Sequence, residues 1–340
     1  MPVHIRSTGV RKDDGGAAVK PTANYVPVPL VFASDESYAM PLATALRSIV
    51  EAKRTVDPLE VYILYSNFQD CTRTRVMNSL PAGSALIHWL PVDLTRFEGC
   101  SPDSYISGTT YARLLISELL PRSITKVLYL DADILVFDDL TALQQCDLNG
   151  APVGAVTDRI DWRLKAGETL WTEDLPRVSH YFNAGVLLID LMRWQEKRVS
   201  ERAFAYLRKH PRSPLSDQDA LNVVCDGAWK QLEPRWNFLN DYDMRMSGMA
   251  VGEGPAILHF AGQLKPWQIG ILDPNARLYD RIRSRTRFAR TYRDKLRDFL
   301  AAPHRFLQSG PWWQLKRILR RHEILRRIWV QMVHARRESL

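Results

Sequence analysis

Apolar and polar residues follow one another along the chain in blocks that predict strands alternating with helices. Short, nearly continuous apolar runs favour buried strands, and apolar residues three or four positions apart favour helices between them. The predicted strands cover residues 28–33, 59–65, 84–92, 126–136, 151–156, 181–190 and 255–260, and the predicted helices cover 39–53, 70–80, 111–121, 192–209 and 217–226. Strands that are apolar throughout and alternate with helices indicate an α/β fold with a mostly parallel sheet covered on both faces.

The two ends of the chain follow different patterns. Residues 1–26 are polar, rich in Gly, Ala, Lys and Asp, and without periodicity, so we expect a disordered leader. Residues 277–300 read as a basic helix, and 312–333 combine apolar positions at helical spacing with Arg and Lys on the other face. The sequence therefore predicts a leader (1–26), a globular domain (27–276) and a basic helical C-terminal segment (277–340).

Composition excludes several classes of protein. The 340 residues are 46% hydrophobic and 25% charged, which is ordinary for a globular protein. Four cysteines without metal-ligand spacing do not make a disulfide scaffold. The chain has no run of about 18 apolar residues, and its N-terminus lacks the apolar core of a signal peptide. We therefore expect a cytoplasmic location.

The net charge of +8 is distributed unevenly. Residues 277–340 carry 18 Lys and Arg against 5 Asp and Glu, whereas the remaining residues carry 28 against 33. Such asymmetry indicates an anionic partner for the C-terminal segment. Tryptophan on one face of 312–333 and basic residues on the other favour an interfacial helix on anionic lipid. No nucleic-acid module is recognisable, and a helix packed on the domain with a solvated basic face is the structural alternative.

Two carboxylates are the sharpest candidate for chemistry. Asp131 and Asp133 lie one residue apart at the end of an apolar strand, so both point the same way out of the pleat. In an open α/β sheet such a strand end borders the ligand crevice. Oxygen ligands there suit Mg²⁺ or Mn²⁺, either of which can bind a pyrophosphate. A solvated acidic loop is one alternative. A phosphatase similar to the haloacid dehalogenases is another, although their motif normally opens the domain.

The second cluster is HFAGQLKPW at residues 259–267. His259 follows an apolar run and can supply a third metal ligand. Gly262 allows close backbone approach, and Lys265 supplies a point charge for phosphate. Taken alone, His259 reads as a core histidine, and Trp267 is expected to pack. With the two aspartates, the cluster predicts a metal–diphosphate site.

Five segments in order carry a resemblance to a known family. They are residues 31–49, 109–121, 126–140, 181–194 and 259–267. Together they resemble glycosyltransferase family 8, and in particular the galactosyltransferases that build lipopolysaccharide cores. The resemblance implies a GT-A (Rossmann-like) fold, a UDP-sugar donor, Mn²⁺ or Mg²⁺, and retention of anomeric configuration.

The resemblance also implies roles for individual donor-site residues. Ser37 stands where the family commonly has Asn. Asp35 has a structural alternative as a charge at a helix start, and Arg113 has one as a surface ion-pair partner. The implied donor-binding residues are Ala33, Asp35 and Ser37 at the uridine, Arg113 at the sugar, Asp131, Ala132 and Asp133 with His259 at the metal, and Gly262 and Lys265 at the diphosphate.

The catalytic side is implied in the same way. The resemblance places Asn183 beside the donor sugar, Asp217 and Gln218 at its reactive face, and Asp158 on the acceptor side. As alternatives, Asn183 could satisfy buried backbone and Asp217 could cap a helix. Retaining glycosidases use a carboxylate as nucleophile, whereas the matching residue here is Gln218, a poor nucleophile. We therefore favour same-face attack over double displacement.

These features predict a retaining hexosyltransferase. It would move galactose or glucose from a UDP-sugar to a saccharide or glycolipid of the cell envelope, at the inner face of the cytoplasmic membrane and without nucleic-acid partners. A non-catalytic nucleotide-sugar-binding protein at the membrane surface is the alternative from another class.

Overall fold

A mixed, mostly parallel sheet of seven strands organises the chain. The computed structural model describes residues 28–98, 100, 108–161, 178–211, 213–240, 254–262, 265–268 and 275–294. The strand order is β3-β2-β1-β4-β7-β6-β8. The strands are β1 (Leu30–Asp35), β2 (Leu59–Ser66), β3 (Ala85–Pro91), β4 (Lys126–Leu130), β6 (Val153–Thr157), β7 (Phe182–Asp190) and β8 (Lys230–Gln231). Only β7 runs antiparallel to its neighbours, β4 and β6. The predicted fold class is confirmed.

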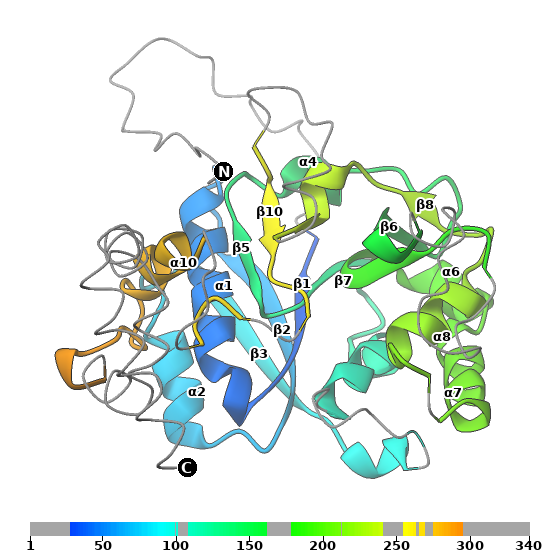
Figure 1. Cartoon of the computed structure of the whole chain (residues 1–340), viewed down its shortest axis with the longest axis horizontal. Helices are drawn as coiled ribbons and strands as arrows, with labels where there is room; N and C mark the ends of the chain where they lie inside the picture. Colours follow the sequence, from blue (N-terminus) through cyan, green and yellow to red (C-terminus); the bar gives the residue numbers. More distant parts are fainter. Residues whose placement is uncertain are drawn as a thin grey trace, which may run out of the picture.

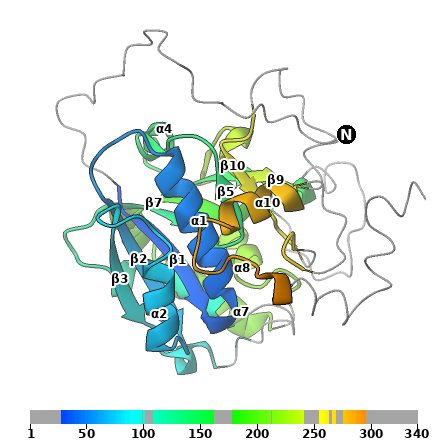
Figure 2. The same ribbon diagram turned by 90° about the vertical axis from the view of Figure 1, so that its left-hand side faces the viewer.

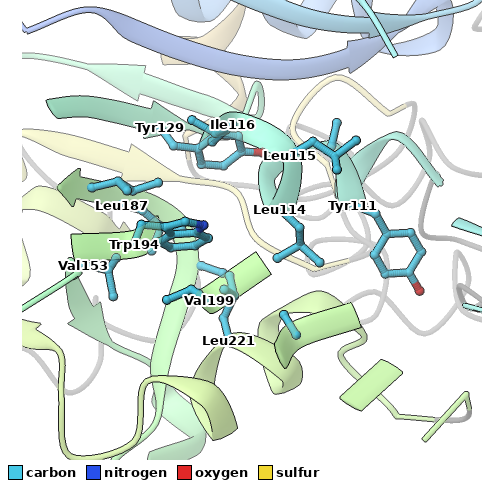
Figure 3. Close-up of a cluster of buried hydrophobic side chains, with 14 of the residues drawn as sticks. Tyr111, Leu114, Leu115, Ile116, Tyr129, Val153, Leu187, Trp194, Val199 and Leu221 are labelled. Carbon is cyan, nitrogen blue, oxygen red and sulfur yellow. The ribbon is translucent and has the colours of Figure 1, made fainter. Parts of the chain in front are cut away.

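Helices cover both faces of this sheet (Figure 1). Successive strand residues point to opposite faces, so Val31 joins one apolar core and its neighbours Leu30 and Phe32 join the other. The second core contains α1 (Ala39–Ala52) and α2 (Asp70–Met77). The first core contains α6 (Leu191–Glu196), α7 (Val199–Lys209) and α8 (Asp217–Val224), with labelled side chains such as Trp194, Leu187 and Leu221 packed together in Figure 3.

A second, small sheet corrects one predicted element. The expected single strand 126–136 is two strands, because the chain leaves the large sheet after β4 and continues as β5 (Ile134–Val136). The small sheet has the order β5-β10-β9, with β10 (Ile257–His259) antiparallel to β5 and parallel to β9 (Phe238–Leu239). The turn between β4 and β5 is the Asp131–Asp133 segment, which therefore lies at the junction of the two sheets.

Two predicted helices also differ from the observed ones. The segment 111–121 is mainly a 3-10 helix, η3 (Gly108–Leu115), followed by the short α3 (Ile116–Leu119). The segment 192–209 is divided into α6 and α7 at Arg198, whose φ of 52° lies in the left-handed region. A left-handed residue commonly ends a helix. The apolar periodicity continues through this break, which is why the sequence predicts a single helix.

The start of the predicted C-terminal segment packs on the globule. Helix α10 (Ala276–Arg283) lies beside α1 (Figure 2), with Tyr279 fully buried among Leu135, Leu258 and Phe260. The predicted helix 277–300 is therefore interrupted after Arg283; residues 292–294 are helical again, and 295–300 lie outside the described residues. Beyond α10, Phe288 is buried under the guanidinium of Arg75 at 4.1 Å.

The remaining predictions for the ends lie outside the described residues. These are the leader and the helix 312–333. The division into 1–26, 27–276 and 277–340 stays a prediction. Among the helices that the structure describes, none is long and apolar enough to cross a bilayer.

Candidate active site

Three side chains that can bind a metal, those of Asp131, Asp133 and His259, come together at the junction of the two sheets. The two aspartates lie in the turn between β4 and β5, and His259 ends β10 opposite Ile134 of β5. Figure 1 shows β5 and β10 side by side. One ligand atom from each residue lies within 4.8 Å of the others. His259 Nε2 is 3.3 Å from Asp133 Oδ1 and 3.9 Å from Asp131 Oδ2. The pairing of β5 with β10 thus brings together side chains 126 positions apart or more in the sequence.

Gly185 makes this close approach possible. A Cβ at position 185 of β7 would lie 2.2 Å from His259 Cε1 and 2.9 Å from Asp131 Oδ2. The same residue also accepts the backbone N–H of Asp131 at its carbonyl, at 2.8 Å. Sequence reasoning gives Gly185 no role beyond its place in the predicted strand 181–190 and the family segment 181–194, although an isolated glycine in an apolar strand is a sign of close packing.

Lys265 neutralises the buried carboxylate of Asp133. Its Nζ donates to Asp133 Oδ2 at 2.5 Å and to the carbonyl of Phe260 at 2.8 Å. Burial opposes ionisation of Asp133, but Lys265 and His259 outweigh it and hold the pKa of this carboxyl below its ordinary value. Gly262 has a φ of +90°, a conformation that favours glycine. Asp133 and Lys265 therefore form a charged pair beside the candidate metal ligands.

Aromatic residues anchor the Lys265 segment. The Trp267 ring lies 5.0 Å from Tyr279 of α10 and 6.0 Å from Tyr38, and Arg290 donates to the Trp267 carbonyl. The expected packing role of Trp267 is confirmed. Tyr38, which sequence reasoning missed, has its pKa raised to about 12 by burial; the positive charge of Lys265 opposes this rise, and the negative charges of Asp133, Asp131 and Asp35 add to it. Tyr38 follows directly after Ser37 and is close enough to Lys265 and to the two aspartates for their charges to affect its pKa.

The predicted uridine residues lie at the end of β1. Asp35 Oδ1 accepts from the backbone N–H groups of Ser37 and Tyr38 at 3.0 and 3.3 Å, and from Ser37 Oγ at 2.5 Å. It therefore caps the short 3-10 helix η1 (Glu36–Tyr38), the structural role weighed against base recognition. Ala33 lies two residues earlier on β1, half-buried, and Ala132 lies buried between the two aspartates. Contacts of these residues to a donor stay a prediction.

Arg113 joins the candidate metal ligands to the predicted sugar side. It comes from η3, is 6% exposed, and its guanidinium lies 3.1 Å from Asp131 Oδ1 and 2.7 Å from Asp217 Oδ2. Its Nη1 donates to the Ala184 carbonyl at 2.5 Å. The surface ion-pair alternative for Arg113 is thus wrong, because the pair is buried. Burial raises the pKa of Asp217 to about 6, since it outweighs the opposing effect of Arg113.

The carboxylate of Asp158 is contacted by two side-chain amides, those of Asn183 and Gln218. Asn183 Nδ2 donates to Asp158 Oδ2 at 2.8 Å, and Gln218 Nε2 lies 3.4 Å from the same oxygen. Gln218 Oε1 accepts from the Ala184 N–H at 2.9 Å. The next acidic residue, Asp219, is fully buried and accepts from Ser213 Oγ and from the Leu215 N–H at 2.6 and 2.9 Å. Of the four predicted catalytic residues, Asp158 thus follows β6 directly, Asn183 lies on β7, and Asp217 and Gln218 begin α8.

The donor set of the Asp131, Asp133 and His259 cluster fits a divalent cation. It offers two carboxylates and one imidazole nitrogen, a combination that suits Mn²⁺ and, through the oxygens, Mg²⁺. His259 Nδ1 lies 2.9 Å from Asn237 Oδ1, which leaves Nε2 as the nitrogen that faces the carboxylates. A buried polar contact of this kind behind a ligating histidine is usual in metal sites. Sequence reasoning also missed Asn237, which no motif marks.

With this geometry established, sequence comparison identifies the family. The profile of glycosyl transferase family 8 matches residues 29–269. The chain therefore belongs to this family and is a glycosyltransferase. Membership confirms the resemblance stated from the five segments and excludes the dehalogenase-like alternative.

Individual relatives agree with this assignment. General stress protein A of Bacillus subtilis is 27% identical over 72% of this chain and 89% of its own length. Lipopolysaccharide 1,2-glucosyltransferase of Escherichia coli is 26% identical over 74% of this chain and 75% of its own length. The crystal structure of the galactosyltransferase LgtC in complex with donor and acceptor sugar analogues superposes with a TM-score of 0.65, at 27% identity, over 76% of this chain and 96% of that one.

Proposed function

We propose that this protein transfers galactose or glucose from a UDP-sugar to a saccharide acceptor, with retention of anomeric configuration and dependence on Mn²⁺. The observation that carries the proposal is the convergence of Asp131, Asp133 and His259 beside the charged side chain of Lys265. The names of the lipopolysaccharide glucosyltransferase and of LgtC support a hexose donor and an acceptor of the lipopolysaccharide or another envelope glycan.

The first requirement of the reaction is to stabilise UDP as it leaves. As the sugar–phosphate bond breaks, negative charge grows on UDP, and groups that bind this charge lower the barrier. When bound to Asp131, Asp133 and His259, Mn²⁺ or Mg²⁺ would supply Lewis-acid neutralisation of that charge. Lys265 adds a fixed positive charge on the same side, and Gly262 leaves room for close approach of the diphosphate. No general acid is then required for departure.

The residues on the predicted sugar side indicate how the acceptor attacks. Gln218 has a neutral amide whose oxygen already accepts from the Ala184 N–H, so it is a poor nucleophile. We therefore favour same-face attack. The bond from the anomeric carbon to the phosphate oxygen breaks, the bond to the acceptor oxygen forms, and the acceptor proton moves to a phosphate oxygen of UDP. The proposal assigns Asp217, which pairs with Arg113, to the reactive face of the sugar, and Asp158, which accepts from Asn183, to the acceptor side.

Mass spectrometry of the protein after incubation with donor tests this step. Same-face attack predicts no covalent sugar on the chain. A hexose trapped on Gln218, Asp217 or Asp158 would overturn it.

We further propose that the protein sits on the inner face of the cytoplasmic membrane through its basic C-terminal segment. The charge of residues 277–340 and the tryptophans of 312–333 support this attachment. The test is co-sedimentation with anionic vesicles of the full chain and of a variant in which the six basic residues of 312–333 are replaced by Gln. Equal binding by both would contradict the proposal.

A panel of UDP-sugars, each incubated with the protein and Mn²⁺, tests the proposed activity. Release of UDP from UDP-galactose or UDP-glucose supports transfer and identifies the donor. Binding of UDP-sugar with no turnover on any donor would instead support the non-catalytic alternative.

A further inference from the structure

Asn237 is a buried amide behind the candidate metal ligands. It ends the 3-10 helix η4 (Pro234–Asn237) directly before β9 and is 1% exposed. Its Oδ1 lies 2.9 Å from His259 Nδ1, and its Nδ2 lies 2.8 Å from Asn183 Oδ1. The ion pair of Arg235 with Asp138, at 2.6 Å, ties η4 to the chain that follows β5. The donor and acceptor roles proposed above do not use Asn237.

Hydrogen bonds link the Gly185 N–H to Asn183, Asn183 to Asn237, and Asn237 to His259. The direction of each bond in this chain follows from the first, at Gly185. The backbone N–H of Gly185 can only donate, and it donates to the side-chain oxygen of Asn183 at 2.9 Å. The other side-chain atom of Asn183, Nδ2, meets the carboxylate of Asp158. Asn183 therefore presents its oxygen to Asn237, so Asn237 must donate from its Nδ2 group.

The orientation of Asn237 then determines the proton on His259. With Nδ2 directed at Asn183, Asn237 presents only its carbonyl oxygen to the imidazole. An oxygen acceptor requires a proton on His259 Nδ1. The opposite nitrogen, Nε2, is the one that faces Asp131 and Asp133. The ring is 3% exposed and packs against Gly185, which leaves it little room to turn.

We propose that Asn237 is a positioning residue that holds the proton on His259 Nδ1 and thereby presents Nε2 to a divalent cation. This inference deepens the proposed function and rests on it. Through Asn183, the same chain of amides continues to Asp158, so the candidate metal ligand and the acceptor-side carboxylate share one hydrogen-bonded support. Partners of this kind orient a ligating histidine, and their loss typically weakens metal binding about 10- to 100-fold.

Nuclear magnetic resonance of the unaltered chain, free of metal, tests the proton position directly. The full chain is labelled with ¹⁵N in its eight histidines, and the His259 ring signals are identified by their loss in His259→Gln. We expect Nδ1 of His259 to carry a proton. A ring in which Nδ1 is unprotonated would overturn the proposal, whatever activity the protein has.

Metal affinity tests the consequence with three variants. Asn237→Leu removes the amide at similar volume, and Asn237→Asp keeps an acceptor for the Nδ1 proton. Gln144→Leu removes another buried amide, in α4 (Thr141–Gln144), whose Nε2 donates to the Val28 carbonyl at 2.7 Å. The Mn²⁺ dissociation constant, without nucleotide, is measured from the free-ion electron paramagnetic resonance signal, and the thermal midpoint of each variant is recorded.

We expect Asn237→Leu to bind Mn²⁺ about 10- to 100-fold more weakly, Asn237→Asp to recover most of the affinity, and Gln144→Leu to bind as the unaltered protein does. Unaltered Mn²⁺ affinity in a folded Asn237→Leu would overturn the proposal, and so would equal weakening by Gln144→Leu. If the unaltered protein binds no Mn²⁺, the proposed dependence on Mn²⁺ is wrong. The position of the proton on the His259 ring still tests the proposed role of Asn237.

Discussion

Two buried ion pairs divide the site and behave in opposite ways. On the metal side, Asp133 and Lys265 are 2.5 Å apart, and on the sugar side Asp217 and Arg113 are 2.7 Å apart. All four side chains are buried. Yet the pKa of Asp133 is held below its ordinary value, whereas that of Asp217 is raised to about 6. Distance to a cation therefore does not determine the charge of a buried carboxylate.

The groups that surround each carboxylate explain the difference in pKa. Asp133 has both Lys265 and His259 beside it, and together these outweigh the cost of burial. Asp217 shares the single guanidinium of Arg113 with Asp131, whose own negative charge raises the pKa of Asp217 further. The metal side thus keeps a firmly ionised carboxylate, as a cation requires, while the sugar side holds one that gains a proton in mild acid.

The largest expected effect comes from removing a ligand on the metal side. Asp131→Asn or His259→Ala should lower the Mn²⁺-dependent transfer rate by about 10³-fold, because neutralisation of the leaving diphosphate is worth several kcal/mol. Steady-state UDP release measures the rate, and circular dichroism confirms that the fold is intact. Near-normal turnover in either variant would show that the assignment of the metal ligands is wrong.

The pH dependence of stability tests the sugar side. Because the pKa of Asp217 is raised in the folded protein, the native state keeps a proton that the unfolded chain has lost, so this group contributes stability below pH 4 that is lost as pH rises through about 6. A pKa difference of about two corresponds to about 3 kcal/mol. Asp217→Asn removes this titration.

Urea unfolding in EDTA at pH 4 and pH 7 measures the effect. We expect the free energy of unfolding of Asp217→Asn, relative to the unaltered protein, to be about 3 kcal/mol higher at pH 7 than at pH 4. Asp133 contributes with the opposite sign, losing stability as pH falls, but it is present in both proteins and cancels. A difference that does not change with pH would remove the contrast between the two pairs.

A smaller effect is expected where the two sides touch. Gly185→Ala places a methyl group 2.2 Å from His259 Cε1 and 2.9 Å from Asp131 Oδ2, so these two candidate ligands or the backbone of β7 must shift. We expect Mn²⁺ affinity to fall by about 10- to 100-fold, as for loss of a residue that orients a ligand. Gly254→Ala is the matched control, since nothing lies within 4 Å of a Cβ there. Equal Mn²⁺ affinity of the two variants would mean that the close approach at Gly185 is unimportant.

Much of this arrangement was predictable from local sequence. The apolar runs and helical spacings gave the sheet and its covering helices, and the aspartate pair with His259 and Lys265 gave the candidate metal site. The break of 126–136 into β4 and β5 was not predictable, because its cause is the pairing of Ile134–Val136 with β10, more than 120 residues later. The same reason explains why the roles of Asn237, Gly185 and Tyr38 were not predicted: each contacts a residue that is distant in the sequence.

UDP release from UDP-galactose and UDP-glucose, followed in EDTA and again after Mn²⁺ is restored, tests the central claim most directly. The account predicts that one of these donors is consumed only with Mn²⁺ present, and that Asp131→Asn shows no such response. Consumption of the donor at the same rate in EDTA would contradict it, because the cluster of Asp131, Asp133 and His259 would then have no part in the departure of UDP.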